Sequence, residues 1–373
     1  MLHLDLPTSA EIQALGEHRG WPSVTIVLRT TPLTQDAQAD RIALRNLLRD
    51  AVGSMEAAGA GAREIRDIAE GVEAVVGDDG FWAVQANSLV LFAAPARLRG
   101  FRLPNRLVNR VEVSDRFHLK PLLRAVAFPH HAWVLAISMG AVRLIEVPAE
   151  LPPREVAVPG LPRDAGDAAG RASHVERKGD MASGLATSEH ALLVHYARAV
   201  DRALRPVLAG REVPLVVAAA EPMASAFRAV SSYPHLAAEG IPGSPDRTPN
   251  HTLAEGARRV LDALYAKEVE ALAALYARRA TQGRATADLA QAARAATAGA
   301  VDTLLVDMDA EVPGTVDEED GAVHLAARAD AHSYSVTDEI ARRALRAGAR
   351  VVAARRGDIP GGGDLAAILR YPF

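Results

Sequence analysis

Residues 298–373 constrain the fold of this chain most, because short apolar segments alternate there with one amphipathic helix. Three segments, Val301–Val306, Arg350–Ala354 and Leu365–Leu369, are rich in β-branched and apolar side chains, which predicts three strands. Between the first two, the sequence from Thr337 onward has apolar residues at helical spacing and reaches a stop signal at Gly348. Strands separated by a helix are typical of βαβ units, so this stretch predicts an α/β sandwich.

The composition allows more than one such unit. The chain has 373 residues, which suggests two or three domains, and 49% of them are hydrophobic, enough to bury several cores. The chain has no cysteine, which excludes disulfides and thiolate metal ligands, and we expect neither a metal nor a cofactor. No apolar run approaches the roughly 20 residues that span a bilayer. The first residues lack the basic segment of a secretory signal, so we expect a cytoplasmic location and no membrane contact.

We expect an α/β protein of three domains, each a mixed sheet with helices. Domain one, residues 1–127, contains a β-branched segment at Ser23–Thr30 that predicts a strand. Ala39–Ala58 has apolar residues at the period of a helix. After an Asp-Asp-Gly turn, Phe81–Val84 and Ser88–Ala93 are predicted to form paired strands.

Domain two, residues 128–248, begins with two apolar segments around a Ser-Met-Gly turn, which predicts a hairpin of Ala132–Ile137 and Ala141–Val147. The stretch Pro148–Ser188 is rich in Gly, Ala and Pro and has poor periodicity, so we expect a long loop there. His190–Leu208 then has apolar residues on one helical face.

Domain three, residues 249–373, follows a proline-rich segment, Pro242–Pro249, that is typical of a linker. It opens with a long helix predicted over Leu253–Arg279 and continues into the strands and helix described first.

A basic segment runs from Arg97 to Arg124 with Phe101 and Phe117 interleaved. Contact with structured RNA needs positive charge for phosphates and planar groups for bases. The net charge of −4 argues against indiscriminate nucleic-acid binding but allows a local basic face. The segment therefore predicts an RNA contact, and a solvated face of an ordinary domain is the alternative. The candidate contact residues are Arg97, Arg99, Arg102, Arg106, Arg110, Arg116 and Lys120.

A second basic region lies on the predicted C-terminal helix. Arg342 and Arg346 are four residues apart and share a helical face, with Arg343 beside them. These three arginines are candidates for contact with RNA or an acidic partner protein.

Several phrases in this sequence, taken in order, resemble a known superfamily. SDRFHLKPLL near the end of domain one, then AGAVDTLLV, DEIARRAL, RVVAARRGD and AAILRYPF in domain three, are similar to segments of class-one peptide-chain release factors and Pelota. They look more like the bacterial archaeo-eukaryotic release factor-like family, which includes the ribosome-hibernation factor Balon. The resemblance implies a three-domain architecture whose last domain is like the kink-turn-binding ribosomal proteins. It also implies binding of ribosomal RNA in the A site of idle or stalled ribosomes, as in hibernation, stress response or rescue, with elongation factor Tu or another translational GTPase as partner.

Release factors carry a Gly-Gly-Gln motif in the loop of domain two, where the glutamine positions a water at the ester of peptidyl-tRNA. In this chain, Pro148–Ser188 contains no glutamine and no pair of glycines, and domain one lacks the Asn-Ile-Lys-Ser motif that reads stop codons. We therefore predict no catalytic residues and a non-hydrolytic role. The loop offers basic groups for RNA at Arg171, His174, Arg177 and Lys178. The alternatives are a peptidyl-tRNA or ester hydrolase that uses other loop residues, and an RNA-binding protein that acts away from the ribosome.

Overall fold

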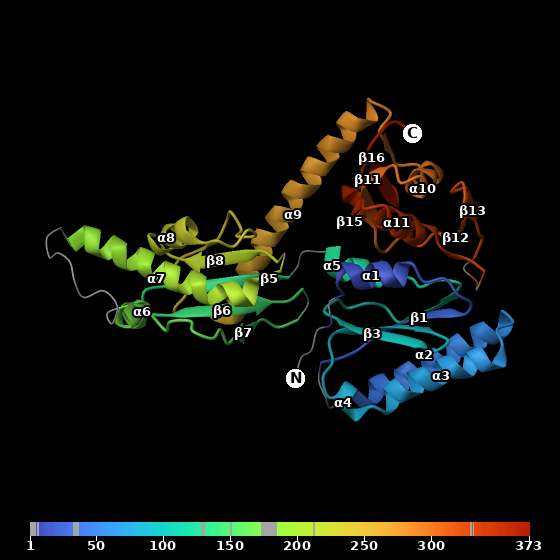
Figure 1. Ribbon diagram of the computed structural model, residues 1–373, viewed down its shortest axis with the longest axis horizontal. Coiled ribbons are helices and arrows are strands. Elements are labelled where there is room, and N and C mark those ends of the chain that lie inside the picture. Colours follow the sequence, from blue (N-terminus) through green and yellow to red (C-terminus); the bar gives the residue numbers. More distant parts are fainter. Residues whose placement is uncertain are drawn as a thin grey trace. The chain divides into compact units, whose positions relative to one another are not determined.

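The computed structural model describes residues 5, 7–32, 37–127, 131–149, 151–172, 185–211, 213–328, 330 and 332–373. The chain forms two compact units (Figure 1): unit 1 is residues 1–128 with 268–373, and unit 2 is residues 129–267. Both units contain sheets covered by helices, which confirms the predicted α/β class. Among the described residues, no helix combines the length and the apolar character needed to cross a bilayer.

The N-terminal part of unit 1 is an antiparallel sheet of four strands in the order β3-β2-β1-β4. Its elements are α1 (Ser9–Gly16), β1 (Ser23–Arg29), α2 (Ala37–Ala57), α3 (Ala62–Gly77), α4 (Asp79–Trp82), β2 (Ser88–Ala94), β3 (Arg97–Leu103), β4 (Arg110–Ser114) and α5 (Lys120–Ala127). Val24 and Ile26 pack with α2 and α3, whereas Val27 and Phe92 belong to the core that contains α1. The sheet is therefore buried on both faces, since successive side chains of a strand point to opposite sides.

The predicted strand at Phe81–Val84 is wrong, because this segment begins in the short helix α4. The Asp78 carboxylate accepts a hydrogen bond from the backbone N–H of Phe81 (2.9 Å), which caps the helical turn. The Trp82 indole is buried and donates to the carbonyl of Val75 (2.8 Å). The cap and this burial outweigh the strand propensity of the aromatic residues, and β2 pairs instead with β1 and β3.

The C-terminal part of unit 1 contains a sheet in the order β10-β16-β11-β15, with β15 parallel and β16 antiparallel to β11, and a small sheet β13-β12-β14. Its elements are β10 (Ala285–Thr286), α10 (Leu289–Thr297), β11 (Val301–Asp307), β12 (Pro313–Val316), β13 (Val323–Leu325), β14 (Tyr334–Ser335), α11 (Val336–Arg346), β15 (Arg350–Ala354), η2 (Arg356–Asp358) and β16 (Leu365–Leu369). The three strands and the helix predicted for this stretch are confirmed. Gly299 and Gly348 adopt φ of +69° and +74° directly after α10 and α11, as expected for glycines that end helices.

The two parts of unit 1 share one hydrophobic core. Ile12 of α1 and Phe117, which precedes α5, belong to the same buried cluster as Ile340 and Ala344 of α11. This continuous core joins segments that are separated in the sequence by unit 2. The division of the whole chain into domains 1–127, 128–248 and 249–373 remains a prediction.

Unit 2 is a three-layer α/β/α structure around a sheet in the order β7-β6-β5-β8-β9, in which β5 and β6 form the predicted hairpin and β8 runs parallel to β5 and β9. Its elements are β5 (Ala132–Ile137), β6 (Val142–Val147), β7 (Arg154–Val156), α6 (Ala165–Ala172), α7 (Leu185–Leu208), β8 (Leu215–Ala219), α8 (Met223–Val230), β9 (Ile241–Pro242) and the first half of α9 (Asn250–Ala280). Trp133 and Leu135 face α6, α7 and α8, whereas Val134 and Ala136 face α9.

Helix α9 contributes to both units, because Leu253 and Ala257 lie in a core of unit 2 and Leu272 lies in a core of unit 1. The proline-rich segment before it was expected to be a linker, but it is fixed within unit 2. Arg143 of β6 donates to the carbonyls of Pro245 and Thr248, both at 3.0 Å.

The expected long loop over Pro148–Ser188 is also corrected, because it contains β7, α6 and the start of α7. The Asp164 carboxylate accepts from the backbone N–H of Asp167 (2.7 Å) at the start of α6, and Ala165 and Ala168 are buried. Alanine has the highest intrinsic helix propensity, so the small residues of this segment favour a packed helix more than a loop.

Candidate nucleic-acid interface

Helix α7 of unit 2 separates apolar from basic side chains. Leu193, Tyr196, Val200 and Leu204 are buried against the sheet. The opposite face exposes His195, Arg198, Arg202 and Arg205, which follow one another at spacings of three, four and three residues. This spacing places them in one line along the helix, over about 15 Å. We call these four residues the α7 stripe.

Two of the three arginines of the stripe have no ion-pair partner among the described residues. Arg205 pairs with Asp201, whose carboxylate oxygen lies 2.7 Å from Nη2, and Asp201 is itself buried. The structure gives Arg198 and Arg202 no carboxylate partner within the part of the chain that it describes. Guanidinium groups in a row are suited to phosphate oxygens, because each presents a fork of N–H donors. The arrangement can therefore bind a nucleic-acid backbone.

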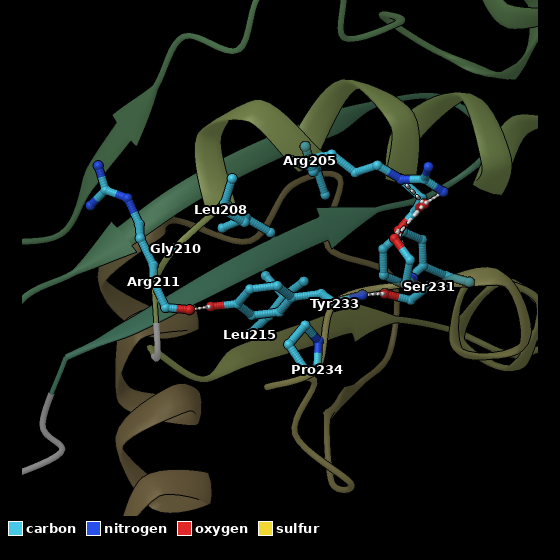
Figure 2. Close-up of a pocket in the computed structure, with 13 residues that line it drawn as sticks. Arg205, Leu208, Gly210, Arg211, Leu215, Ser231, Tyr233 and Pro234 are labelled. Carbon is cyan, nitrogen blue, oxygen red and sulfur yellow. Dashed lines mark hydrogen bonds and ion pairs between the residues drawn. The ribbon is translucent and has the colours of Figure 1, made fainter.

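A cavity of about 230 Å³ lies beside the C-terminal end of α7 (Figure 2). The Asp201 carboxylate accepts from the backbone N–H of Ser232 (2.9 Å) as well as from Arg205, and so joins α7 to the segment after α8. The Tyr233 hydroxyl donates to the carbonyls of Arg211 (3.0 Å) and Val213 (2.6 Å), and burial raises its pKa.

These polar groups already satisfy one another, and the rest of the lining is apolar, including Leu204, Leu208, Leu215 and Phe227. Figure 2 shows the Arg211 side chain extending away from the Tyr233 ring. The cavity therefore resembles a packed junction between helices. Its described residues include no activated nucleophile.

The basic segment of unit 1 divides into exposed and buried residues. Arg97, Arg99 and Arg106 are exposed. Arg99 is paired with Glu11, and Arg97 Nη1 lies 3.3 Å from His18 Nδ1. The RNA contact predicted for these arginines remains a proposal, weakened at Arg99 by its carboxylate partner.

Arg102 and Arg110 are partly covered and paired. Arg102 Nη1 lies 2.8 Å from Asp5 Oδ2, and the guanidinium stacks 4.0 Å from the Phe81 ring centroid. Arg110 bridges Glu112 and Glu311. Their charge is therefore largely used within the unit.

The RNA contact predicted for Arg116 and Lys120 remains a proposal, which burial disfavours, because their side chains are only 9% and 2% exposed. Lys120 Nζ donates to the carbonyl of Ala310, and burial lowers its pKa. A phosphate can reach a buried cation only through a cavity that opens onto the side chain.

The partner contact predicted for Arg342 and Arg343 is disfavoured in the same way, since they are 4% and 1% exposed and both donate to the buried Glu339. Burial by itself would raise the pKa of Glu339, but the hydrogen bond from Arg342 and the charges of Arg116 and Arg342 lower it to about 2. Arg346 is the exposed member of the predicted partner-binding set. Glu339 lies three and four residues before the two arginines, and this spacing was a sequence signal that we missed.

Two of the phrases that carried the family resemblance meet in this interior. Asp338 of DEIARRAL accepts hydrogen bonds from the backbone N–H groups of Leu119 (3.0 Å) and Lys120 (2.7 Å) of SDRFHLKPLL, and so caps α5. Burial raises the pKa of Asp338 to about 6, although these N–H groups and the Lys120 charge act against it. Burial lowers the pKa of the adjacent His118 to about 4.

The basic residues predicted in the central segment are not tested. His174, Arg177 and Lys178 lie outside the described residues, and for Arg171 the structure describes only the backbone at the end of α6. The α7 stripe was missed because we read His190–Leu208 only for its apolar face. Its signal was the three-four spacing of Arg198, Arg202 and Arg205.

The comparisons with known proteins bear mainly on unit 2. The family model of bacterial archaeo-eukaryotic release factor family 11 matches residues 129–267. No curated protein matches the sequence.

Solved structures with similarity include the archaeal translation termination factor aRF1, with 16% identity over 98% of this chain and 99% of that chain and a TM-score of 0.25. Ribosome-bound archaeal Pelota has 17% identity over 74% of this chain and 72% of its own, with a TM-score of 0.41. Dom34 of S. cerevisiae has 12% identity over 74% of each chain and a TM-score of 0.41. All these TM-scores are below 0.5, so these structures add no argument. The similarity to release-factor-like proteins is supported by the family model. The unit that carries the α7 stripe is thus the part of the chain similar to family 11, and the predicted resemblance to release-factor-like proteins is confirmed at that level.

Proposed function

We propose that this protein is a release-factor-like translation factor that binds ribosomal RNA and occupies the A site of idle or stalled ribosomes. The observation that carries the proposal is the α7 stripe, because it lies within the unit that matches family 11. Arg198 and Arg202 offer two guanidinium groups without a carboxylate partner among the described residues, which suits phosphate contact. A role in hibernation or rescue, with a closer relationship to Balon, is part of the same proposal.

The role is non-hydrolytic. Release of a peptide requires a group that positions water at the ester, and Pro148–Ser188 supplies neither the glutamine nor the paired glycines of the release-factor motif. The proposal also implies a cytoplasmic location. Elongation factor Tu or another translational GTPase is the expected partner, since release factors and Pelota act with such GTPases.

Co-sedimentation with 70S ribosomes at increasing salt concentrations tests the RNA contact. We expect the double variant Arg198→Ala/Arg202→Ala to bind more weakly, and the slope of log affinity against log salt to fall by about 2, one for each lost phosphate contact. Arg66→Ala is the matched control, because Arg66 of α3 is also a helical arginine and its side chain is 66% exposed. Equal affinities and slopes for the double variant and the control would remove the stripe from the interface.

Peptide release from loaded ribosomes tests the absence of hydrolysis. We expect binding without release above the uncatalysed rate. Efficient release would contradict the proposal and favour the hydrolase alternative. Binding to free structured RNA without binding to 70S particles would instead favour an RNA-binding protein that acts away from the ribosome.

A further inference from the structure

Unit 1 contains a cavity of about 390 Å³ with an unusual number of arginines in its wall. The residues that line it are Glu17, Arg19, Asp115, Arg116, Glu318, Arg342 and Arg346. Two of its three carboxylates are held by a neighbour. Asp115 accepts two hydrogen bonds from Arg116 (2.7 and 2.9 Å), and Glu17 accepts one from Gln13 (2.9 Å).

The third carboxylate, Glu318, lies where several guanidinium groups converge. One of its oxygens is 3.2 Å from Arg116 Nη2 and 3.8 Å from Arg19 Nε, and the other is 3.3 Å from Arg343 Nη2. Glu318 belongs to the turn after β12, and its side chain is 54% exposed. The Glu318 carboxylate reaches these guanidinium groups from an exposed turn. Its oxygens therefore lie where the oxygens of a bound anion would lie.

The positive charge around Glu318 is not fully paired, as the contacts of Arg19 show. Its Nη1 donates to the carbonyls of Gly16 (3.1 Å) and His18 (2.7 Å), whereas Nε and Nη2 lie 3.8 Å from the nearest carboxylates, too far for hydrogen bonds. Burial first, and then the charges of Arg342 and Arg116, lower the pKa of Arg19. An anion with several oxygens would use Arg19 donors that have no acceptor among the residues that the structure describes.

A second cavity of about 450 Å³ adjoins the first, since Asp115, Arg116 and Glu318 line both. Its wall includes the rings of Trp21 and His332, which are nearly parallel (14°) with centroids 6.4 Å apart. Flat aromatic surfaces stack on nucleobases, and arginine forks fit phosphate oxygens. Each cavity has the volume typical of small-ligand sites.

We propose that unit 1 binds a nucleotide across these two cavities, with its phosphate in place of the Glu318 carboxylate beside Arg19 and Arg116, and its base on the Trp21 and His332 rings. The site does not depend on the function proposed above. The same chemistry is available from a free mononucleotide and from one nucleotide of a single-stranded RNA.

Tryptophan fluorescence gives a direct readout. Of the three tryptophans, Trp82 and Trp133 are buried and Trp21 is partly exposed, so a base that stacks at the site quenches mainly Trp21. We expect AMP to quench the wild-type protein weakly, because the phosphate competes with Glu318. Glu318→Gln removes both the competitor and one negative charge, and we expect it to bind AMP at least tenfold more tightly.

Glu319→Gln is the matched control. Glu319 is the exposed neighbour in the same turn, and it makes no side-chain ion pair with the described residues. We expect this variant to bind AMP as the wild type does. Inorganic phosphate should compete with AMP and raise the melting temperature of Glu318→Gln, including in a Trp21→Phe background where the quenching is lost.

Equal AMP affinities for Glu318→Gln and Glu319→Gln would overturn the proposal, as would the absence of quenching and of any phosphate-induced thermal shift in Glu318→Gln. A trinucleotide that binds much more tightly than AMP identifies RNA as the source of the nucleotide. Equal binding of the two identifies the free nucleotide.

Discussion

Helices α7 and α11 each carry three closely spaced arginines, but the two sets have opposite environments. In α11, Arg342 and Arg343 are buried around Glu339, and Arg342 also donates to the carbonyl of Gly16 (3.2 Å) at the end of α1. In α7, Arg198 and Arg202 are exposed. The difference teaches that arginine spacing alone does not identify a binding face. The neighbouring element and the nearest carboxylate decide whether the charge is available to a partner.

The buried set has a structural consequence. Arg116 lies 2.9 Å from Glu339, so one carboxylate receives charge from both the N-terminal and the C-terminal parts of unit 1. Buried ion pairs add little stability relative to apolar packing, but removing one partner leaves uncompensated buried charge. We therefore expect this cluster to fix how the two parts of unit 1 meet.

The largest expected effect comes from Glu339→Gln. Arg116, Arg342 and Arg343 would then share a neutral acceptor in a buried place, and we expect unfolding to become easier by about 3–5 kcal/mol. Urea denaturation measures this change, with Glu319→Gln as the exposed control that should stay within about 0.5 kcal/mol. A loss below about 1 kcal/mol for Glu339→Gln would show that the buried arginines of α11 matter no more to stability than the exposed arginines of α7. That result would contradict the contrast drawn between the two helices.

Asp338→Asn tests the burial of the same helix through pH. The folded-state pKa of Asp338 is raised to about 6 from an ordinary value of 3.8, so folding favours its protonated form. Its contribution to stability is therefore fully present below about pH 3.8 and is lost as pH rises from there through about 6. We expect the wild type to lose about 2.4 kcal/mol relative to Asp338→Asn between pH 4 and pH 7. Urea unfolding at a series of pH values measures the difference, and parallel curves would show that Asp338 is not buried as described.

Arg202→Ala should act on binding and leave folding intact. We expect its free energy of unfolding to change by no more than about 0.5 kcal/mol, because the side chain is exposed and has no carboxylate partner within the described residues. The slope of ribosome affinity against salt should fall by about 1. A large loss of stability with unchanged binding would assign Arg202 the structural role that we give to Arg342.

The smallest effect is expected at Arg66, which lies 3.8 Å from Glu70 on the exposed face of α3. We expect Arg66→Ala to change the free energy of unfolding by less than about 0.5 kcal/mol, because water screens such exposed pairs. Thermal or urea unfolding checks this. A larger cost would show that exposed arginines of this protein contribute more to folding than the comparison between α7 and α11 assumes.

The sequence was most informative where structure depends on neighbouring residues. The strands at Val301–Asp307, Arg350–Ala354 and Leu365–Leu369 and the stop at Gly348 follow from local propensity and backbone freedom, and all four were predicted. The candidate site was predicted less well, because apolar periodicity hid the basic face of α7.

The sequence by itself determined the α/β class, most helices and strands, and the absence of the release-factor glutamine from the central segment. Tertiary structure alone decided which arginines are buried and how the two parts of unit 1 share a core. The Asp338 carboxylate shows the reason, because it caps α5 through the backbone N–H groups of Leu119 and Lys120, which lie 219 and 218 residues away. No local pattern encodes such a contact, since it depends on how whole elements pack after they have formed.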